Sequence, residues 1–201
     1  MSVTPLFATP FYRAELADPA LLADLAASCS ALAQDDAAGR RWCRDNGYQG
    51  YTSYASLNDL PVRDPAIAAL VKALGRHVLA FAAAAHLDLP RKPRLDSLWV
   101  NVLKPGAGHS GHIHPHSWIS GTFYVAVPEG AGALKLEDPR LPMLMAAPAR
   151  TADAPAAARP FVYMQPQPGT LFLWESWLRH EVVAGSRGQK GERISVSFNY
   201  A

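Results

Sequence analysis

Hydrophobic residues recur at helical spacing in two segments of the first half of the chain. The first segment begins at Asp18 and runs to Leu32, and the second begins at Asp64 and runs to Phe81. In both segments the aspartate is followed by a proline, a pair that typically caps and starts a helix. We therefore predict two amphipathic helices, separated by a polar and aromatic loop with one short strand between Gly39 and Leu60.

The pattern changes after Pro93, where apolar and polar residues begin to alternate with the period of a β-strand. Between strands, the segment from Pro139 to Pro160 is rich in alanine and proline, so we predict a long loop without regular structure. Helices followed by short strands favour a mostly β domain with helices packed against a sandwich or barrel. The predicted strands span Leu95–Leu103, Gly121–Val127, Gly132–Leu136, Thr170–Trp174 and Arg193–Tyr200.

The composition narrows the class of protein. Hydrophobic residues make up 49% of the 201 residues and charged residues 18%, which excludes intrinsic disorder. The formal net charge is only +2, and no basic run exceeds the Arg91–Arg94 cluster, which argues against nucleic acid or an anionic membrane as the partner. We find no signal peptide and no apolar run long enough to span a membrane, and Cys29 and Cys43 form no C-x-x-C pair. These features favour a cytoplasmic protein, either a monomer or a homodimer.

Histidine is distributed very unevenly along the chain. Of the seven histidines, four lie within the eight residues from His109 to His116. On an extended chain alternate side chains share a face, so His112 and His114 can reach one ion. Imidazole is a good ligand for iron, zinc, copper and nickel. The alternative interpretation is a solvated polar loop or a ladder of hydrogen-bonded histidines.

Polar residues also mark the last predicted strand. Arg193 follows His180 by thirteen residues, and Ser195 shares the strand face of Arg193. When three protein groups hold Fe(II), an α-keto acid can chelate two of the open positions, and its far carboxylate then needs a cation. A guanidinium suits that carboxylate because it donates two parallel hydrogen bonds. We therefore predict an anion-binding role for Arg193 rather than that of a surface arginine.

Two further polar residues lie on predicted strands near the histidines. Asn101 shares a face with Trp99 and Leu103, and its amide either binds a cosubstrate carboxylate or joins neighbouring strands. Tyr124 either gives its hydroxyl to the cosubstrate or packs in the core.

An ordered set of motifs runs through the second half of the chain. These motifs are Trp99-Val-Asn101, His112-Ile-His114-Pro115, Ser117, Ser120-Gly121, Phe123-Tyr124-Val125, Asp138-Pro139-Arg140, Pro168-Gly169, Ser176-Trp177-Leu178, His180-x-Val182 and Arg193-Ile-Ser-Val-Ser-Phe-Asn199. In order and spacing they resemble the 2-oxoglutarate/Fe(II) oxygenases of the H-x-H-P-x-S-x-x-S-G type. The resemblance extends upstream to the segments 5–10 and 51–53, so it covers nearly the whole chain.

The resemblance implies a double-stranded β-helix, or jelly-roll, fold in a single domain over residues 1–201. Residues 1–92 are then a helical N-terminal support, and residues 93–201 form the β-helix core. The implied activity is that of a dioxygenase that uses Fe(II), 2-oxoglutarate and O₂ to hydroxylate a small-molecule or peptide substrate. The resemblance supplies the third histidine, so we expect the metal to be held by His112, His114 and His180. We expect the cosubstrate to be bound by Arg193, Ser195, Asn101 and Tyr124.

One feature departs from the wider superfamily, in which H-x-D is more usual than H-x-H. Three neutral imidazoles leave a metal dication at its full charge, which alters metal affinity and metal choice. Alternatively, a carboxylate enters the site from Glu137, Asp138 or Glu175. The remaining histidines of the cluster, His109 and His116, either orient the ligands or lie in exposed loop.

A cupin-type metal-binding protein, acting as a zinc or nickel isomerase or as a ligand-binding module, is the main alternative. Gly106 followed by the H-x-H pair matches the start of the cupin pattern, but positions 118 and 119 hold Trp and Ile where that pattern needs Glu. The cupin pattern also gives no role to Arg193. A metal-free relic that only binds ligands or partners is the third alternative. Metal analysis of the purified protein separates the relic from both metal-dependent classes.

Overall fold

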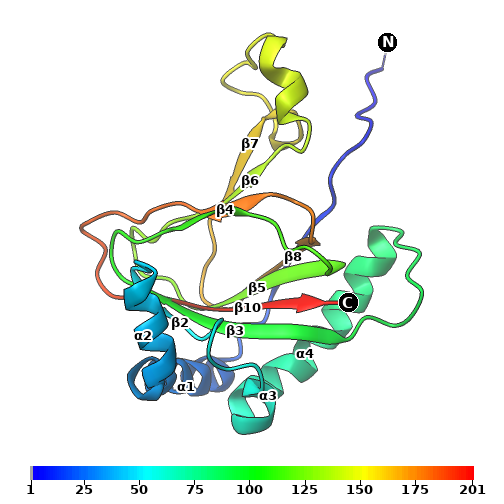
Figure 1. Cartoon of the computed structure of the whole chain (residues 1–201). Helices are drawn as coiled ribbons and strands as arrows, with labels where there is room; N and C mark the ends of the chain where they lie inside the picture. Colours follow the sequence, from blue (N-terminus) through cyan, green and yellow to red (C-terminus); the bar gives the residue numbers. More distant parts are fainter. Residues whose placement is uncertain (1) are drawn as a thin grey trace.

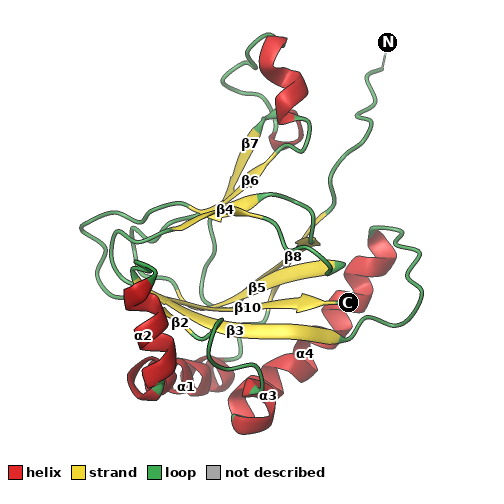
Figure 2. Ribbon diagram, in the orientation of Figure 1, coloured by secondary structure: helices red, strands yellow, loops and turns green. Residues whose placement is uncertain are grey.

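Two antiparallel sheets face each other in the computed structural model, which describes residues 2–201 (Figure 2). The major sheet holds, in spatial order, β1 (Phe11–Glu15), β8 (Thr170–Glu175), β5 (Ile119–Ala126), β10 (Arg193–Tyr200), β3 (Leu95–Leu103) and β2 (Gly50–Thr52). The minor sheet holds β4 (His109–His112), β9 (His180–Val182), β6 (Leu134–Glu137) and β7 (Phe161–Met164). The predicted mostly β architecture is therefore correct.

Four helices cover the outer face of the major sheet (Figure 1). They are α1 (Pro19–Asp35), α2 (Ala37–Asp45), α3 (Leu60–Arg63) and α4 (Pro65–Ala84). Both predicted helix starts are correct, since the Asp18 carboxylate accepts hydrogen bonds from the first turn of α1 and the Asp64 carboxylate does so for α4. The helix α2 lies in the segment predicted as loop. This nine-residue helix buries only Gly39 and Cys43, too few positions to produce a visible hydrophobic period.

The helix α4 forms much of the core with the major sheet. Its stripe from Ile67 to Phe81 is buried, and it belongs to the same apolar cluster as Val100, Phe123 and Val196 of the sheet. By length and composition α4 could also cross a membrane, although polar residues such as Lys72 and Arg76 interrupt its apolar run. The buried stripe fits a helix that packs on a sheet.

The N-terminal part of the chain contributes strands as well as helices to the fold. The strands β1 and β2 both precede residue 93, and they form the two edges of the major sheet. The β-helix core therefore draws on residues before 93. The short strand predicted between Gly39 and Leu60 is present as β2, whereas β1 was not predicted. Strands β4, β7 and β9 were also missed, because strands of three or four residues carry little alternation.

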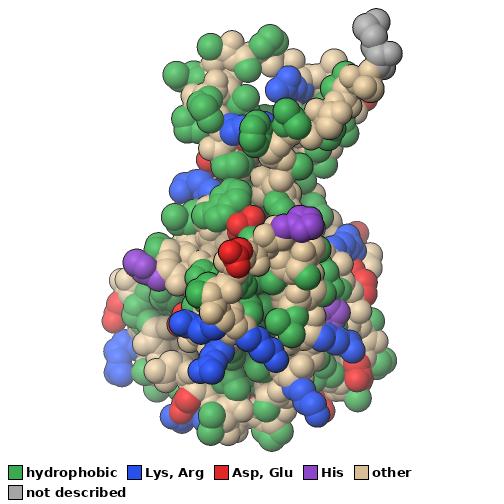
Figure 3. Space-filling view, turned by 90° about the vertical axis from the view of Figure 1, so that its right-hand side faces the viewer, with side chains coloured by type: hydrophobic (Ala, Val, Ile, Leu, Met, Phe, Trp, Pro, Cys, Tyr) green, Lys and Arg blue, Asp and Glu red, His purple; other side chains and the backbone are tan. Residues whose placement is uncertain are grey.

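Strands β6 and β7 and residues 138–160 between them form an arm that stands away from the body (Figures 1 and 3). Contrary to the prediction, residues 139–160 contain regular structure, namely the 3₁₀ helices η1 (Leu141–Ala146) and η2 (Ala156–Ala158). Proline permits such short helices, although it stops longer ones. Ala154 is the only buried residue among residues 139–160.

We expect the fold to survive removal of the tip of the arm. The Asp138 amide donates to the Pro160 carbonyl at 2.8 Å, so a short Gly-Ser turn can replace residues 139–159 without separating β6 from β7. Because little core is lost, the free energy of unfolding should change by about 1 kcal/mol or less. Urea unfolding followed by circular dichroism measures this change. Aggregation, or loss of a cooperative transition, would show that the arm is structural.

Candidate metal and cosubstrate site

Three imidazoles meet between the two sheets. His112 at the end of β4 is paired with His180 at the start of β9, and His114 lies two residues further along the chain. The nearest ring nitrogens of the three side chains lie within 4.8 Å of one another, and the Nε2 atoms of His114 and His180 are 3.3 Å apart. The alternation that predicted a shared face for His112 and His114 is therefore realised in the structure, which also adds the third histidine.

Backbone carbonyls orient two of these rings. Nδ1 of His112 lies 2.7 Å from the Ser110 carbonyl oxygen, and Nδ1 of His180 lies 2.8 Å from that of Leu178. With Nδ1–H donating to a carbonyl, the lone pair of Nε2 is free to bind a metal ion.

Burial keeps two of the imidazoles in the form that binds metals. Burial, followed by the nearby His112, lowers the pKa of His114 to about 4 and that of His180 to about 3. Both rings are therefore neutral near pH 7, as a metal ligand must be. The chemistry of the donor set thus fits a divalent first-row metal ion such as Fe(II).

The carboxylates considered as ligands all lie elsewhere. Glu137 pairs with Arg179 at 3.4 Å, Asp138 pairs with Arg140 at 2.8 Å, and Glu175 accepts a hydrogen bond from Trp177 Nε1 at 3.0 Å. Within residues 2–201, the cluster around His112 contains no acidic side chain.

The two spare histidines differ from each other. The ring of His109 stacks on His112 with centroids 4.7 Å apart, and burial, followed by the charges of His112 and Arg193, lowers the pKa of His109 to about 4. His109 thus supports a ligand ring from behind. His116 is exposed, and its backbone has a positive φ of 72°.

Arg193 lies in the same cavity as the three imidazoles. Its side chain is 3% exposed, and its Nε and Nη2 atoms have no hydrogen-bond partner in the described chain. The Cζ atom lies 4.8 Å from the ring centroid of Tyr124, whose buried hydroxyl also lacks a partner. Burying a cation and several donors without partners is costly, so the cavity is built for an anionic ligand that accepts hydrogen bonds.

The remaining predicted cosubstrate residues line this cavity as well. Ser195 is buried on the same strand face as Arg193. The Asn101 amide accepts a hydrogen bond from the Tyr48 hydroxyl at 3.2 Å and donates one to the Ser197 hydroxyl at 3.2 Å. Asn101 therefore joins neighbouring segments in the structure. The cavity between these side chains measures about 30 Å³.

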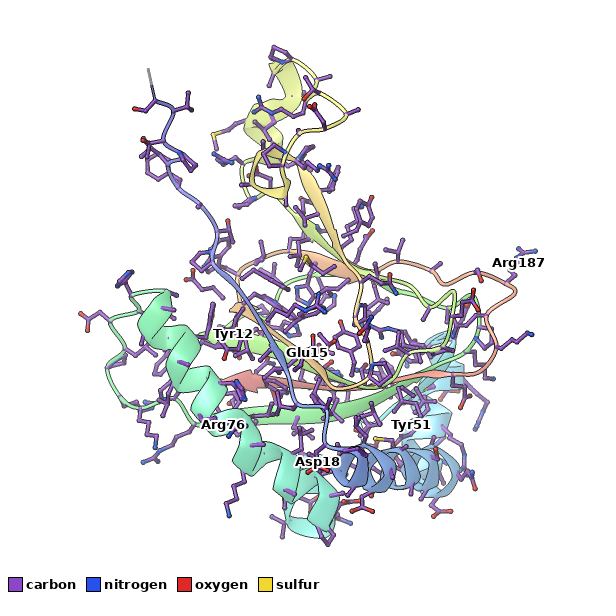
Figure 4. All side chains as sticks on the ribbon, turned by 180° about the vertical axis from the view of Figure 1, so that it is seen from behind. Tyr12, Glu15, Asp18, Tyr51, Arg76 and Arg187 are labelled. Carbon is purple, nitrogen blue, oxygen red and sulfur yellow. The ribbon has the colours of Figure 1, made fainter. Side chains whose placement is uncertain are left out.

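Tyr48 was missed as a site residue because it lies in the segment between α2 and β2, which has no regular period. A carboxylate holds this segment in place. Asp36 accepts hydrogen bonds from the hydroxyls of Tyr51 and Ser56 and from the Gly39 amide. Tyr51, labelled in Figure 4, lies beside α1 in that view.

We expect Asp36→Asn to lower the melting temperature by about 2–6 °C, because it weakens a helix cap and two hydroxyl contacts worth about 1–2 kcal/mol.

Burial raises the pKa of Asp36, but the hydrogen bonds outweigh it and hold this pKa below its ordinary value of 3.8. The stabilisation is thus fully present above that value and is lost as the pH falls through the folded-state pKa. The wild-type advantage over Asp36→Asn in thermal melts should therefore shrink below about pH 4. Asp35→Asn, an exposed neighbour, is the control; equal melting temperatures of all three proteins at pH 7 would contradict the prediction.

Solved structures with a similar fold include two prolyl hydroxylases and an epimerase. A Pseudomonas putida prolyl-4-hydroxylase is 18% identical, with 96% of this chain and 92% of that chain covered and a TM-score of 0.60. SnoN, an α-ketoglutarate-dependent epimerase from nogalamycin biosynthesis, is 13% identical, with 98% and 79% covered and a TM-score of 0.64. A Trichoplax adhaerens prolyl hydroxylase is 13% identical, with 94% and 82% covered and a TM-score of 0.58. The fold is therefore the double-stranded β-helix of the 2-oxoglutarate oxygenases. No curated protein sequence matches the chain.

The sequence identifies the family more directly than the fold does. Residues 97–199 match the family model described as "Putative 2OG-Fe(II) oxygenase", and the chain belongs to this family. The predicted family, the oxidoreductase class and the dependence on Fe(II) and 2-oxoglutarate are thereby confirmed. The roles of the individual site residues stay predictions.

Proposed function

We propose that this Fe(II)- and 2-oxoglutarate-dependent dioxygenase hydroxylates its substrate at a metal held by His112, His114 and His180. Arg193 would bind the far carboxylate of 2-oxoglutarate, with Ser195 and Tyr124 beside it. The observation that carries these assignments is the buried guanidinium with two unpartnered nitrogens, in the cavity that the imidazoles line.

When bound, Fe(II) and 2-oxoglutarate supply the oxidation of a C–H bond by O₂, with release of succinate and CO₂. The imidazoles of this chain hold the metal without adding charge, so a dication there would keep its full formal charge and attract a dicarboxylate. The indole of Trp174 lies edge-on to His180 with ring centroids 4.7 Å apart, and it is buried. This packing excludes water from one side of the metal ligands.

The proposal also includes a substrate class and a cellular compartment. The small net charge supports a small-molecule or peptide substrate rather than nucleic acid or a membrane surface. We place the protein in the cytoplasm, where its two cysteines remain reduced thiols, and both are free in the structure.

The test is anaerobic addition of 2-oxoglutarate to the Fe(II)-loaded protein. We expect a visible charge-transfer band, because the α-keto acid chelates the metal, and succinate after O₂ is admitted. The Zn(II)-loaded protein is the matched control, and it should show no band. If the Fe(II) protein also shows none, the cosubstrate assignment fails and the cupin-type alternative regains support.

A further inference from the structure

A second cavity opens beside His112 and His114 and measures about 540 Å³. We call it the aromatic cleft. Small-molecule sites typically measure about 300–1,000 Å³, so the cleft has room for an ordinary metabolite-sized group. It adjoins the Arg193 cavity, because both are lined by the two histidines. Its lining also includes Trp42, Tyr48, Tyr54, Asp96 and Trp99.

The aromatic rings of the cleft lead toward the candidate metal ligands. Trp99 lies between Tyr54, whose ring stands edge-on at 5.4 Å, and His114, whose ring centroid is 5.6 Å away. A group seated against Trp99 is thus one ring away from a metal ligand. Trp42 and Tyr48 bring the number of large aromatic side chains to four. The faces of such rings carry negative electrostatic potential.

Histidines aside, Asp96 is the only described side chain lining the cleft that is charged at neutral pH. Asp96 is exposed and forms no ion pair within residues 2–201, and no described lysine or arginine lines the cleft. The neighbouring cavity has the opposite character, since a buried guanidinium lies there. An anion is therefore drawn to Arg193, whereas the aromatic cleft suits a cation.

We propose that the aromatic cleft binds the substrate through an organic cation, an alkylammonium group held by Asp96 and by the exposed ring of Tyr54, with the buried Trp99 behind that ring. A cation over aromatic faces beside a carboxylate is stabilised by both. The catalytic meaning of this site rests on the proposed function of the adjoining histidines. Binding of the cation itself needs neither the metal nor 2-oxoglutarate.

The test compares choline with 3,3-dimethylbutan-1-ol, a neutral molecule of nearly the same shape. Each is titrated into the metal-free protein while tryptophan fluorescence is followed, since Trp42 and Trp99 line the cleft. We expect choline to bind about 2- to 5-fold more tightly than the alcohol, from the usual strength of a cation–π contact at a partly exposed site.

Substitutions locate the binding. Asp96→Asn should weaken choline binding by up to about 5-fold and leave binding of the alcohol unchanged, because only the cation loses a charge partner. Asp88→Asn removes another exposed carboxylate, which lies outside the cleft, and should change the binding of neither molecule. Tyr54→Leu should weaken choline binding, whereas Tyr54→Phe keeps the ring and should retain it. Tyr54 is 64% exposed, so neither change should disturb the fold.

The outcomes separate this inference from the proposed function. Equal affinity for choline and the alcohol, or no effect of Asp96→Asn, would overturn the cationic substrate. These results would leave the charge-transfer test untouched. Conversely, choline binding without a charge-transfer band would leave the cleft as a cation site and remove its link to 2-oxoglutarate chemistry.

Discussion

His114→Ala abolishes stoichiometric Fe(II) binding: this is the largest effect that we expect from a single substitution. With two imidazoles left, the chelate is incomplete, and the affinity for Fe(II) should fall at least about 100-fold. Changing a residue that only orients a metal ligand already lowers metal affinity by up to about 100-fold, so loss of a ligand itself should cost at least as much. The measurement is anaerobic equilibrium dialysis with Fe(II), with circular dichroism to verify that the fold is intact. The side chain of His114 is only partly buried, so the fold should tolerate its removal.

Two other variants make the result specific. His116→Ala removes an exposed histidine two residues away and should keep full Fe(II) occupancy. His114→Asp replaces an imidazole by a carboxylate in the H-x-D arrangement and should also retain Fe(II), since a carboxylate is a competent third ligand. Full occupancy in His114→Ala would reject the three-histidine site and direct attention to His109, which stacks on His112.

Local spacing was enough to predict the features that depend on one segment. The alternation of a strand placed His112 and His114 on one face and did the same for Arg193 and Ser195, and all four side chains line one cavity. The Asp-Pro pairs likewise located both long helices. A shared strand face and a helix start both depend on residues that are close along the chain, so both can be predicted from the sequence alone.

Features that depend on two distant segments could not be predicted in this way. The pairing of His112 with His180 is set by the register between β4 and β9, two strands of four and three residues. Tyr48 reaches Asn101 across 53 positions, from a segment without a period. The absence of a carboxylate from the described cluster follows from local partners, such as Arg179 for Glu137, that spacing does not reveal.

Loss of Arg193 should weaken 2-oxoglutarate binding by roughly 30-fold to several thousand-fold, because truncating a buried charge-assisted pair costs about 2–5 kcal/mol. The metal should remain bound, since no ligand is changed. Arg193→Lys should recover only part of the affinity, because an ammonium cannot reproduce the planar pair of donors of a guanidinium. Arg187→Ala is the matched control, since Arg187 lies on an exposed loop and points outward (Figure 4).

The affinity is read from the charge-transfer absorbance of the anaerobic Fe(II) protein as 2-oxoglutarate is added. Because binding to the folded state stabilises it, the cosubstrate should also raise the melting temperature of the wild type and of Arg187→Ala but not that of Arg193→Ala. The Arg193 variants test the assignment of 2-oxoglutarate as cosubstrate more sharply than metal binding does. A cupin-type site would also bind a metal through its histidines, but it would not need Arg193. If Arg193→Ala bound 2-oxoglutarate as tightly as the wild type, the two unpartnered nitrogens of this buried guanidinium would need another anion to explain them.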